Sequence, residues 1–555
     1  MEIARREFLE SVFGASLALG LGAGCDKAPN APDANAFDSI PGALLGQSAG
    51  RGHLLRADDL RERIAHVAAL APTQTGVVIA GGGPAGLSVA YALHKAAQQD
   101  FVLLELEPVL GGTARGAESP LTAYPWGAHY LPVPHRHNVP LTMLLREMGV
   151  VAGEDAQGKL IVTEPHAVRA LEERLFYRGY WYPGLYLDAG ASASDLAERA
   201  RFSELVARWV RYRDGQGRPA FTIPTRLCST APELRALDQL SAQHLLQREG
   251  FRSKRLFWLL DYACRDDYGL RLADTSAWAL LFYFAARIEQ PGEAPSELIT
   301  WPEGNFALVK HLQRAAVAQT RTDTLVFDIR ELGDHVQVLA WDCQRDVGLH
   351  YRAEHAVVAT PRFVSERIVR SKRERARAQP SGEQASYAPW LVANLHLSGR
   401  PHARGAQLAW DNVLYDSPSL GYVCATHQRG SDYGPSVLTY YLPLSDADPK
   451  RAHQKLLDGD LPAWRQAVLL DLQRAHPELP SLTTRLDVFR WGHAMVRPEV
   501  GSIFGAARVG AQDSEGRVHF AHSDLSGLSL FEEAFDHGVR AAREVLTQRG
   551  LSSAL

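Results

Sequence analysis

The feature that most constrains the fold is a glycine-rich turn between an apolar segment and a segment of helical pattern. Residues 77–80 are Val-Val-Ile-Ala, and the spacing Gly-x-Gly-x-x-Gly follows at Gly81, Gly83 and Gly86. The first glycine permits a tight turn, the second lets the backbone approach a pyrophosphate, and the third lets helix and strand pack closely. The N-terminus of the helix would offer N–H groups and partial positive charge to phosphates. The residues expected to contact the dinucleotide in this turn are Gly81, Gly83, Pro84, Ala85 and Gly86.

A second strand with an acid at its end completes the nucleotide-binding pattern. Residues 101–104 are Phe-Val-Leu-Leu, and Glu105 follows them, about 20 residues past the turn. A carboxylate at this place can accept hydrogen bonds from both ribose hydroxyls, and it repels a 2′-phosphate. The pattern therefore predicts a dinucleotide without a 2′-phosphate, bound to a Rossmann-type unit over about residues 76–106.

The residues after Glu105 carry a family resemblance. A second glycine segment, residues 111–115 (Gly-Gly-Thr-Ala-Arg), resembles one in the flavoprotein superfamily that contains amine oxidases, protoporphyrinogen oxidase and phytoene desaturases. Further segments resemble the same superfamily in the same order, at residues 326–329, 355–361, 489–498 and 518–538. The resemblance implies FAD, and because no cysteine lies near the last segment, we expect the FAD to be non-covalent. The contacts it implies here are Gly111, Gly112, Thr113, Arg115 and Val326.

The last of these segments resembles the flavin-contacting motif of the superfamily. The resemblance implies that Asp524 approaches the ribityl chain or pyrophosphate and that Gly527 contacts the cofactor. A helix that begins near Leu528 would direct its N–H groups toward negative charge on the reduced flavin. The sequence departs from the usual Ala-Gly-Asp, because residues 521–524 are Ala-His-Ser-Asp.

Candidate substrate contacts come from residues 125–131 (Pro-Trp-Gly-Ala-His-Tyr-Leu), which resemble the segment that passes the flavin in relatives. His129 is the candidate catalytic acid or base, and a structural histidine is the alternative. Trp126 and Tyr130 are candidate substrate-binding residues in the same segment. Trp491 is expected either to form a wall of the substrate cavity or to belong to the core.

A lysine that many simple amine oxidases place near the flavin has no counterpart in the sequence. No Pro-Leu-Gly-x-x-Lys-like segment is present, and Lys310 follows a segment that resembles desaturase-like members instead. Two aromatic-rich segments, residues 176–186 and 280–284, are expected either to line a hydrophobic channel or to form ordinary core.

Residues 1–25 resemble an export signal. Arg5-Arg6 precedes a short stretch rich in glycine, alanine and leucine over residues 11–24, which is too short to span roughly 30 Å of hydrocarbon. The twin arginine resembles a signal that implies export of the folded protein with its cofactor bound. Cys25 ends Leu-Gly-Ala-Gly-Cys, which resembles a lipoprotein processing site; simple cleavage nearby is the alternative to lipidation of Cys25.

These N-terminal features imply a protein on the periplasmic face of a bacterial membrane, held at the membrane surface by a lipid. The stretch that follows the signal, residues 26–56, is predicted to be a flexible tether, because it begins with a segment rich in proline, alanine, asparagine and aspartate.

Composition excludes several other classes. The chain has 555 residues, 46% of them hydrophobic and 22% charged, and its net charge of −4 offers no positive excess for nucleic acid. Its 5 cysteines include no CxxC pair, which argues against a zinc ribbon. His129, His135 and His137 lack a nearby carboxylate or cysteine, so no metal site is expected. Ser48 fits a hydrolase motif but lacks the buried strand that such a nucleophile needs.

We expect an α/β fold with a glutathione-reductase-type FAD-binding Rossmann domain, assembled from discontinuous segments, and an α+β substrate domain. The predicted divisions are the signal at 1–25, the tether at 26–56, the FAD-binding parts at 57–135, 300–365 and 485–555, and the substrate parts at 136–299 (helical) and 366–484.

The resemblance implies an FAD-dependent oxidoreductase that takes a hydride from a C–N or activated C–C unit of a small organic molecule. The electron acceptor would be oxygen, a quinone or a redox protein. One alternative is a redox-neutral flavin enzyme or a carotenoid-type desaturase or isomerase. Another is a non-catalytic, membrane-tethered FAD protein that serves electron transfer or assembly. A cavity open to the flavin would favour an enzyme.

Overall fold

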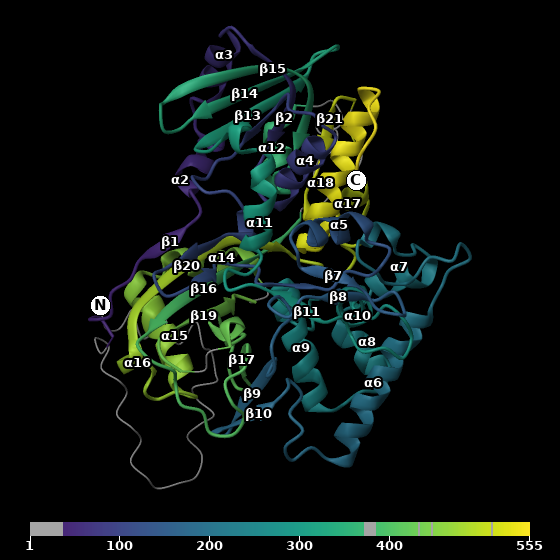
Figure 1. The fold of residues 1–555 in the computed structure, drawn as a ribbon, viewed down its shortest axis with the longest axis vertical. Coiled ribbons are helices and arrows are strands. Elements are labelled where there is room, and N and C mark those ends of the chain that lie inside the picture. Colours follow the sequence, from purple (N-terminus) through teal and green to yellow (C-terminus); the bar gives the residue numbers. More distant parts are fainter. Residues whose placement is uncertain (1–36, 371–384, 431–432, 446–447, 512–513, 515) are drawn as a thin grey trace.

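The computed structural model describes residues 37–370, 385–430, 433–445, 448–511, 514 and 516–555. Two large sheets organise the chain, one at the top of Figure 1 and one at the lower left, and a group of helices lies at the lower right. The predicted mixed α/β fold with parallel strands is confirmed. The export signal and Cys25 lie outside the described residues.

The first sheet has seven strands in the order β12-β3-β2-β15-β14-β13, with β21 beside β15. Strand β2 is parallel to β3 and β15, and β15 is parallel to β21, so the carboxyl ends of these four strands meet at one edge. The strands are β2 (Thr73–Ala80), β3 (Phe101–Leu104), β12 (Thr320–Arg321), β13 (Thr324–Glu331), β14 (Val336–Asp342), β15 (Val347–Val358) and β21 (Val518–Phe520).

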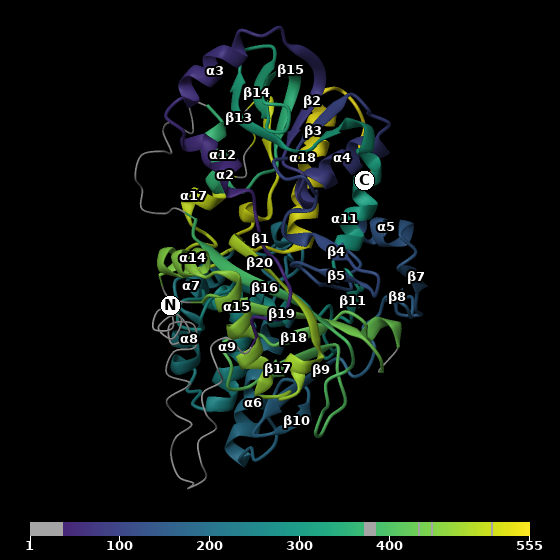
Figure 2. The ribbon, with the colours of Figure 1, turned by 90° about the vertical axis from the view of Figure 1, so that its left-hand side faces the viewer.

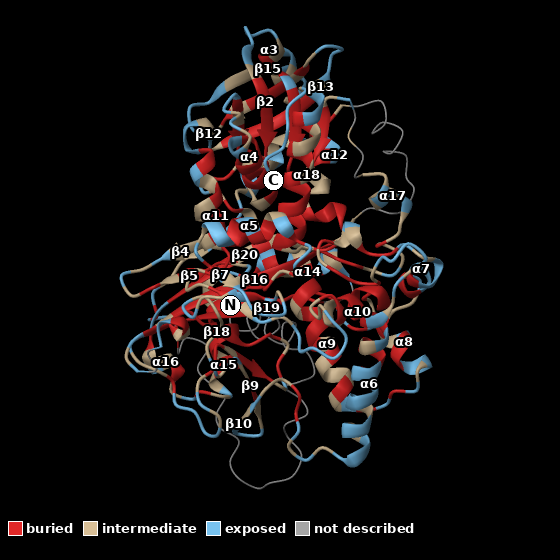
Figure 3. Cartoon of the chain, turned by 45° about the vertical axis from the view of Figure 1, so that its right-hand side comes forward, coloured by how far each residue is buried: buried red, intermediate tan, exposed pale blue. Residues whose placement is uncertain are grey.

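Alternation along β2 explains why both faces of this sheet are covered. Val77 and Ile79 belong to a core with helices α4 (Pro84–Lys95) and α18 (Phe531–Gln548), whereas Val78 and Ala80 belong to the core on the opposite face. Successive side chains of a strand point to opposite faces, so an unbroken apolar run suits a strand buried on both sides. Figure 3 shows this buried centre in red.

The second sheet has eight strands in the order β1-β20-β16-β19-β18-β17-β9-β10. Helices α14 (Pro449–Asp458), α15 (Leu461–Gln473) and α16 (Leu479–Leu482) cover one face, where Trp464 is fully buried. The other face carries an aromatic core that includes Trp390 and Trp491. The strands are β1 (Leu44–Gly46), β9 (Glu173–Tyr177), β10 (Tyr180–Pro183), β16 (Tyr387–Leu397), β17 (Asp411–Leu414), β18 (Tyr422–Cys424), β19 (Ser436–Pro443) and β20 (Thr483–Val496).

The helical group is supplied by α6 (Ala193–Arg211), α7 (Pro232–Asp238), α8 (Ala242–Arg248), α9 (Lys254–Tyr268) and α10 (Ala277–Ala285). Helix α9 begins where the Ser253 hydroxyl accepts a hydrogen bond from the N–H of Leu256. It ends at Gly269, which has φ +63° and lies so close to β16 that a Cβ would be 2.5 Å from that of Ala388. These two ends fix which side chains of α9 face the second sheet.

The N-terminal part of the substrate region differs from the helical expectation. Residues 151–183 contain the strands β7 (Val151–Glu154), β8 (Leu160–Val162), β9 and β10, and helices dominate only from residue 193. The aromatic segment around residues 176–182 forms the β9–β10 hairpin, because its large side chains pack against neighbouring strands such as β17.

Part of the predicted tether is also packed against the body. Residues 44–46 form β1, which pairs in parallel with β20, and Phe37 and Ile40 are buried in the core of the second sheet. The Ser48 N–H and hydroxyl both donate to the carboxylate of Glu107, at 2.8 and 3.0 Å. This stretch, residues 37–56, therefore runs from the second sheet to the first (Figure 2), and we call it the strap. Its apolar residues and an open strand edge on β20 account for the difference.

Among the described residues, no helix combines the length and apolar character needed to cross a membrane. The remaining short elements near the site are β6 (Tyr130–Pro132), β11 (Leu298–Thr300) and α11 (Phe306–Leu312).

Candidate active site

The glycine turn lies at the carboxyl edge of the first sheet, between β2 and α4. A Cβ on Gly81 would lie 2.7 Å from the carbonyl oxygen of Ala359, and one on Gly86 would lie 1.9 Å from that of Gly81. Gly81 also has φ +109°, so both positions require glycine for the fold itself. A Cβ on Gly83, in contrast, would come no closer than 4.0 Å to another described residue. The space beside Gly83 is left for a ligand.

The second glycine segment faces this space. Gly112 has φ +52°, and a Cβ on it would lie 3.4 Å from the Cα of Gly83. No described side chain caps the N-terminus of α4, so its first N–H groups remain available to an anion. The two predicted glycine motifs thus form one anion-binding cradle.

Glu105 and Arg115 lie at the same edge. The carboxylate of Glu105 accepts hydrogen bonds from the N–H groups of Gly82 and Glu107, at 2.5 and 2.8 Å, and keeps lone pairs for a ribose. Arg115 is 8% exposed, and its buried Nε has no hydrogen-bond partner among the described residues. The open space beside Gly83 and the buried Nε of Arg115, which has no partner among the described residues, suit a bound dinucleotide, so these residues fit FAD.

The remaining predicted cofactor contacts are placed less directly. The Oδ2 of Asp524 accepts from the N–H of Arg362 at 2.9 Å and from the hydroxyl of Tyr387 at 2.5 Å. Protein groups thus already engage this carboxylate, and its role toward FAD stays a prediction. Gly527, with φ +75°, precedes α18, which begins at Phe531 and not near residue 528. Val326 is buried in β13.

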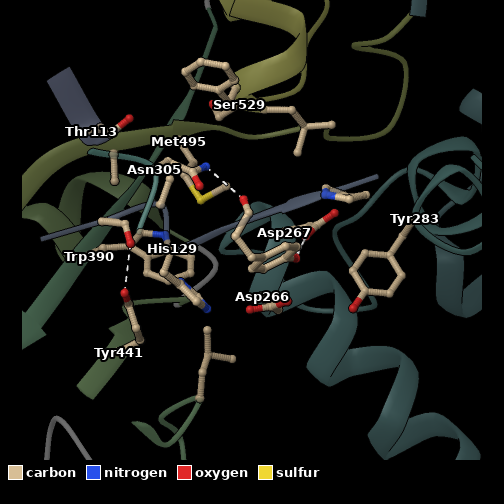
Figure 4. A pocket seen from close by; sticks show the side chains of 18 of the residues that line it. Thr113, His129, Asp266, Asp267, Tyr283, Asn305, Trp390, Tyr441, Met495 and Ser529 are labelled. Carbon is tan, nitrogen blue, oxygen red and sulfur yellow. Dashed lines mark hydrogen bonds between the residues drawn. The ribbon is translucent and has the colours of Figure 1, made fainter. Parts of the chain in front are cut away.

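A pocket of about 1110 Å³, part of it open to solvent, lies between the cradle, the second sheet and the helices. Figure 4 shows Thr113, Met495 and Ser529 toward one end, which we call the cofactor end. Asp266 and Tyr283 lie at the other, which we call the far end. None of the described residues that line it is a lysine.

Four carboxyl groups line this pocket, and one guanidinium is present to balance them. The four are Asp266, Asp267, Asp411 and Glu532. Arg287 pairs with Asp267 at 3.0 Å, and it also donates to the hydroxyl of Tyr130 at 3.1 Å. Among the described residues, no lysine or arginine forms an ion pair with Asp266, Asp411 or Glu532, although the positive charge of Arg287 also acts on Asp266 and Glu532.

Burial changes the ionisation of these acids. It raises the pKa of Glu532 to about 7 and the pKa of Asp411 well above its usual range, because desolvation penalises the charged form. The pKa of Asp266 is raised by the same desolvation and by the neighbouring charge of Asp267. The pocket therefore holds protons that a bound cation would displace.

His129 lies in the pocket, as predicted. Its ring stacks on that of Tyr441, with centroids 4.8 Å apart, and lies 5.4 Å from that of Trp410. Burial lowers the pKa of His129 to about 4, so the ring is neutral at neutral pH, with one N–H donor and one acceptor nitrogen. Its catalytic role stays a prediction, and the observed packing equally suits a wall of the cavity.

The pocket brings together two of the three predicted substrate contacts. Tyr130 and Trp491 line it, whereas Trp126 lies behind Trp491 and accepts a hydrogen bond from its indole N–H through the backbone carbonyl, at 2.6 Å. Trp491 thus lines the pocket and also belongs to the aromatic core of the second sheet. The aromatic segment of α10 contributes Phe282 and Tyr283 to the lining, so the channel alternative holds for part of that segment.

Sequence reasoning missed the acids. Asp266 and Asp267 sit in α9, Asp411 begins β17 and Glu532 belongs to the first turn of α18. The available signal was an adjacent Asp-Asp pair at the end of an amphipathic helical segment and a Glu-Glu pair in the closing segment. Neither pair indicates by itself that the groups share a cavity.

Comparison with solved structures identifies the same overall fold. A putrescine oxidase bound to putrescine matches with a TM-score of 0.62 and 15% identity, over 86% of this chain and 100% of that one. Cyclohexylamine oxidase from Brevibacterium oxydans IH-35A matches with a TM-score of 0.59 and 15% identity, over 86% of this chain and 100% of that one. A CLA-producing fatty acid isomerase from P. acnes matches with a TM-score of 0.57 and 14% identity, over 85% of this chain and 98% of that one. No curated protein sequence matches the chain significantly.

The sequence itself matches the profile of a family described as flavin containing amine oxidoreductase, over residues 84–546. The match begins at Pro84, inside the glycine turn, and ends in α18, so it includes the second glycine segment and all residues that line the pocket. The chain therefore belongs to the flavin-containing amine oxidoreductase family, and its cofactor is FAD.

Proposed function

We propose that this FAD-dependent oxidoreductase oxidises an amine at the carbon next to nitrogen. The observation that carries the proposal is the acidic lining of the pocket, since Asp266, Asp411 and Glu532 line it and form no ion pair with a described residue. Buried carboxyl groups without partners are costly, and a ligand ammonium would relieve that cost.

Glu532 is the candidate proton acceptor for the reacting nitrogen. It is 5% exposed, lines the pocket three residues after Ser529, and has a pKa of about 7, so it is partly ionised near neutral pH. An ammonium must lose a proton before the adjacent C–H bond can yield a hydride, because the nitrogen lone pair stabilises the cation formed. FAD, when bound, accepts that hydride. The iminium product then reacts with water to give a carbonyl compound and a smaller amine or ammonia.

The aromatic walls orient the substrate and exclude water. Tyr130 is held by Arg287 and Asp267, and Trp491 is held by the carbonyl of Trp126, so both rings are fixed before a substrate arrives. Fixed walls of this kind lower the entropy cost of aligning the reacting C–H bond.

The pocket disfavours the alternatives. A fatty acid, the substrate type named for the isomerase neighbour, would bring a carboxylate into a site already rich in carboxyl groups. A carotenoid-type hydrocarbon would leave Asp266 and Glu532 buried without partners. A non-catalytic electron-transfer protein has no need of a cavity of this size beside the cofactor cradle.

The test is anaerobic addition of alkylamines and, separately, of fatty acids to the purified holoprotein, followed by the visible spectrum of the flavin. We expect amines to bleach the oxidised flavin bands and fatty acids to leave them unchanged. Bleaching by neither class, or by fatty acids alone, would contradict the proposal. Readmission of air or addition of a quinone would then identify the electron acceptor.

We also propose that the protein is exported through the twin-arginine pathway and anchored through Cys25. The support is the sequence of residues 1–25, which lie outside the described part of the structure. Fractionation of cells that produce the wild-type chain and the Cys25→Ala variant tests this. The wild type should sediment with membranes and the variant should be released into the periplasm; retention of both in the cytoplasm would contradict it.

A further inference from the structure

We infer that the side-chain oxygen of Asn305 accepts a hydrogen bond from the nitrogen that is oxidised, so that this carboxamide orients the substrate before the hydride leaves. The inference rests on the proposed function, because it assigns a contact to the same amine. It adds a second group, besides Glu532, that meets the reacting nitrogen, and this group is neutral.

The first step is a buried acceptor without a donor. Asn305 is 2% exposed and lines the pocket, and its buried Oδ1 has no hydrogen-bond partner among the described residues. A buried oxygen of this kind costs free energy while it is unpaired, and most such atoms in folded proteins have a partner. Among the described residues that line the pocket, Asn305 carries the one side-chain amide. A donor on a ligand would complete its hydrogen bonding.

The second step fixes which atom of the carboxamide is left for a ligand. The amide nitrogen, Nδ2, donates to the backbone carbonyl of Tyr130 at 2.8 Å. A carbonyl can only accept, so the nitrogen must lie on that side and Oδ1 on the other. Figure 4 shows the carboxamide in the pocket, with Thr113 and Met495 at the cofactor end. The side chain therefore offers an acceptor, which suits a bound N–H group and not a carboxylate.

The third step is the support of this carboxamide by the backbone. Strand β11 pairs with β6, and the hydroxyl of Thr300 donates to the carbonyl of His129 at 2.8 Å. The N–H of Asn305 donates to the carbonyl of Ala128 at 3.0 Å. Gly304 makes the turn between these contacts with φ +61°, and a Cβ on it would lie 2.7 Å from the same carbonyl oxygen. The acceptor is thus fixed before a substrate arrives, which lowers the entropy cost of orienting the substrate.

The fourth step is the chemistry of the reacting nitrogen. A primary ammonium that gives a proton to Glu532 breaks one N–H bond, keeps two, and gains a free lone pair. An N–H bond held by the Oδ1 of Asn305 restricts rotation about the C–N bond. The lone pair is then kept in one orientation relative to the adjacent C–H bond, from which the hydride leaves. Glu532 takes the proton, and Asn305 orients the nitrogen.

The first experiment compares pentylamine, N-methylpentylamine and N,N-dimethylpentylamine, which keep two, one and no N–H bonds after deprotonation. The limiting rate of anaerobic flavin reduction is measured for each amine with the holoprotein. We expect the rate of the wild type to fall about tenfold from the secondary to the tertiary amine, because Asn305 then has no donor. Asn305→Leu should be about tenfold slower than wild type with the first two amines and little changed with the third.

Two further variants separate contact with the substrate from support of the backbone. Asn305→Asp, protonated in this buried place, can donate to the Tyr130 carbonyl and keeps an acceptor oxygen, so the fall in rate should return. Thr300→Val removes the bond to the His129 carbonyl from a residue that does not line the pocket, and it should also show the fall.

Three results would overturn the inference and leave amine oxidation standing. The wild type could reduce its flavin equally fast with all three amines, the fall in rate could survive in Asn305→Leu, or it could be lost equally in Thr300→Val. FAD content measured from absorbance verifies that each variant is folded.

A pair of probes that cannot be oxidised separates failure of the inference from failure of the proposed function. tert-Butylammonium has N–H bonds but no C–H bond next to nitrogen, and tetramethylammonium has nearly the same size and charge but no N–H bond. If no amine reduces the flavin, the proposed function fails, and the visible spectrum of the flavin still reports binding of both probes.

We expect the wild type to bind tert-butylammonium about tenfold more tightly than tetramethylammonium. The difference should shrink to about twofold in Asn305→Leu and stay as in the wild type in Thr300→Val. Equal or absent binding of the two probes by the wild type, or an unchanged difference in Asn305→Leu, would overturn the inference.

Discussion

The two ends of the pocket are assembled in different ways. At the cofactor end, the cradle comes from two short continuous segments, residues 81–86 and 111–115, and its geometry follows from backbone conformation. At the far end, Asp266, Asp411 and Tyr441 come from α9, β17 and β19, which lie far apart in the sequence. The cofactor end is a property of local sequence, and the far end is a property of the tertiary fold.

This difference implies a division of labour. If the cradle binds FAD, as we propose, it recognises a ligand that the family shares, so a short motif suffices for it. If the far end contacts the substrate, its residues can differ between members without disturbing the cradle. Substitutions at the two ends should therefore separate cofactor binding from substrate choice.

The largest effect should come from Gly83→Ala. The added Cβ meets no described atom nearer than 4.0 Å, so the protein should fold, but the methyl group occupies the space left for the pyrophosphate. We expect the dissociation constant for FAD to rise about 100-fold, or about 2.7 kcal/mol, in a titration of apoprotein with FAD. Gly153→Ala, in β7 with open space around it, is the control. Unchanged FAD affinity would mean that the cradle is not the cofactor site.

A large effect confined to turnover should follow from Glu532→Gln. Removal of the proton acceptor should lower kcat/KM for an amine about 100-fold and remove the rising limb of its pH profile near the pKa of about 7. FAD content should not change. Glu204→Gln, on an exposed position of α6, serves as control. A normal rate and pH profile in Glu532→Gln would assign the proton to another group.

A moderate effect should appear in the pH dependence of hexamethonium binding. Hexamethonium carries two permanent positive charges at every pH, so any change in its affinity with pH comes from the ionisation of groups on the protein. Because the raised pKa of Asp266, about 7, keeps its carboxyl group protonated in acid, affinity should increase as pH rises through that value. We expect about a tenfold gain from about pH 6 to about pH 8, and a flat profile in Asp266→Asn. Affinity that falls with rising pH would contradict the assigned charge.

The smallest effect should come from Ser48→Ala in the strap. The variant loses the hydroxyl hydrogen bond to Glu107 but keeps that of the backbone N–H. We expect the free energy of unfolding to fall by about 1 kcal/mol in urea, with FAD affinity unchanged. A marked loss of FAD affinity would show that the cofactor end also depends on residues remote in sequence, which would break the comparison.

The contrast also explains what the sequence could predict. Gly81 and Gly86 indicated the turn, because a Cβ at either position would meet backbone atoms at 2.7 and 1.9 Å, and Gly83 indicated a ligand, because a Cβ there meets no described residue closer than 4.0 Å. Trp126 was assigned to the substrate cavity from its segment alone, but the fold turns its carbonyl toward Trp491 and buries its ring behind it. His129 and Tyr130 of the same segment line the pocket, whereas the position of Trp126 depends on its contact with β20.

The missed features share one physical cause. Asp266 and Asp411 line one pocket only after α9 packs against the second sheet, and no periodicity in either segment predicts that contact. The strap was predicted to be part of a flexible tether because the sequence around residue 30 has the composition of one. In the structure, however, β1 pairs with the edge of β20 and Phe37 is buried in the core of the second sheet. Non-local partners decided both outcomes.

The most direct test of the account is the visible spectrum of the wild-type holoprotein after anaerobic addition of cadaverine. The account predicts loss of the oxidised flavin bands with cadaverine and with pentylamine alike. Oxidised flavin that persists in the presence of both amines, with the protein folded and FAD bound, would contradict it.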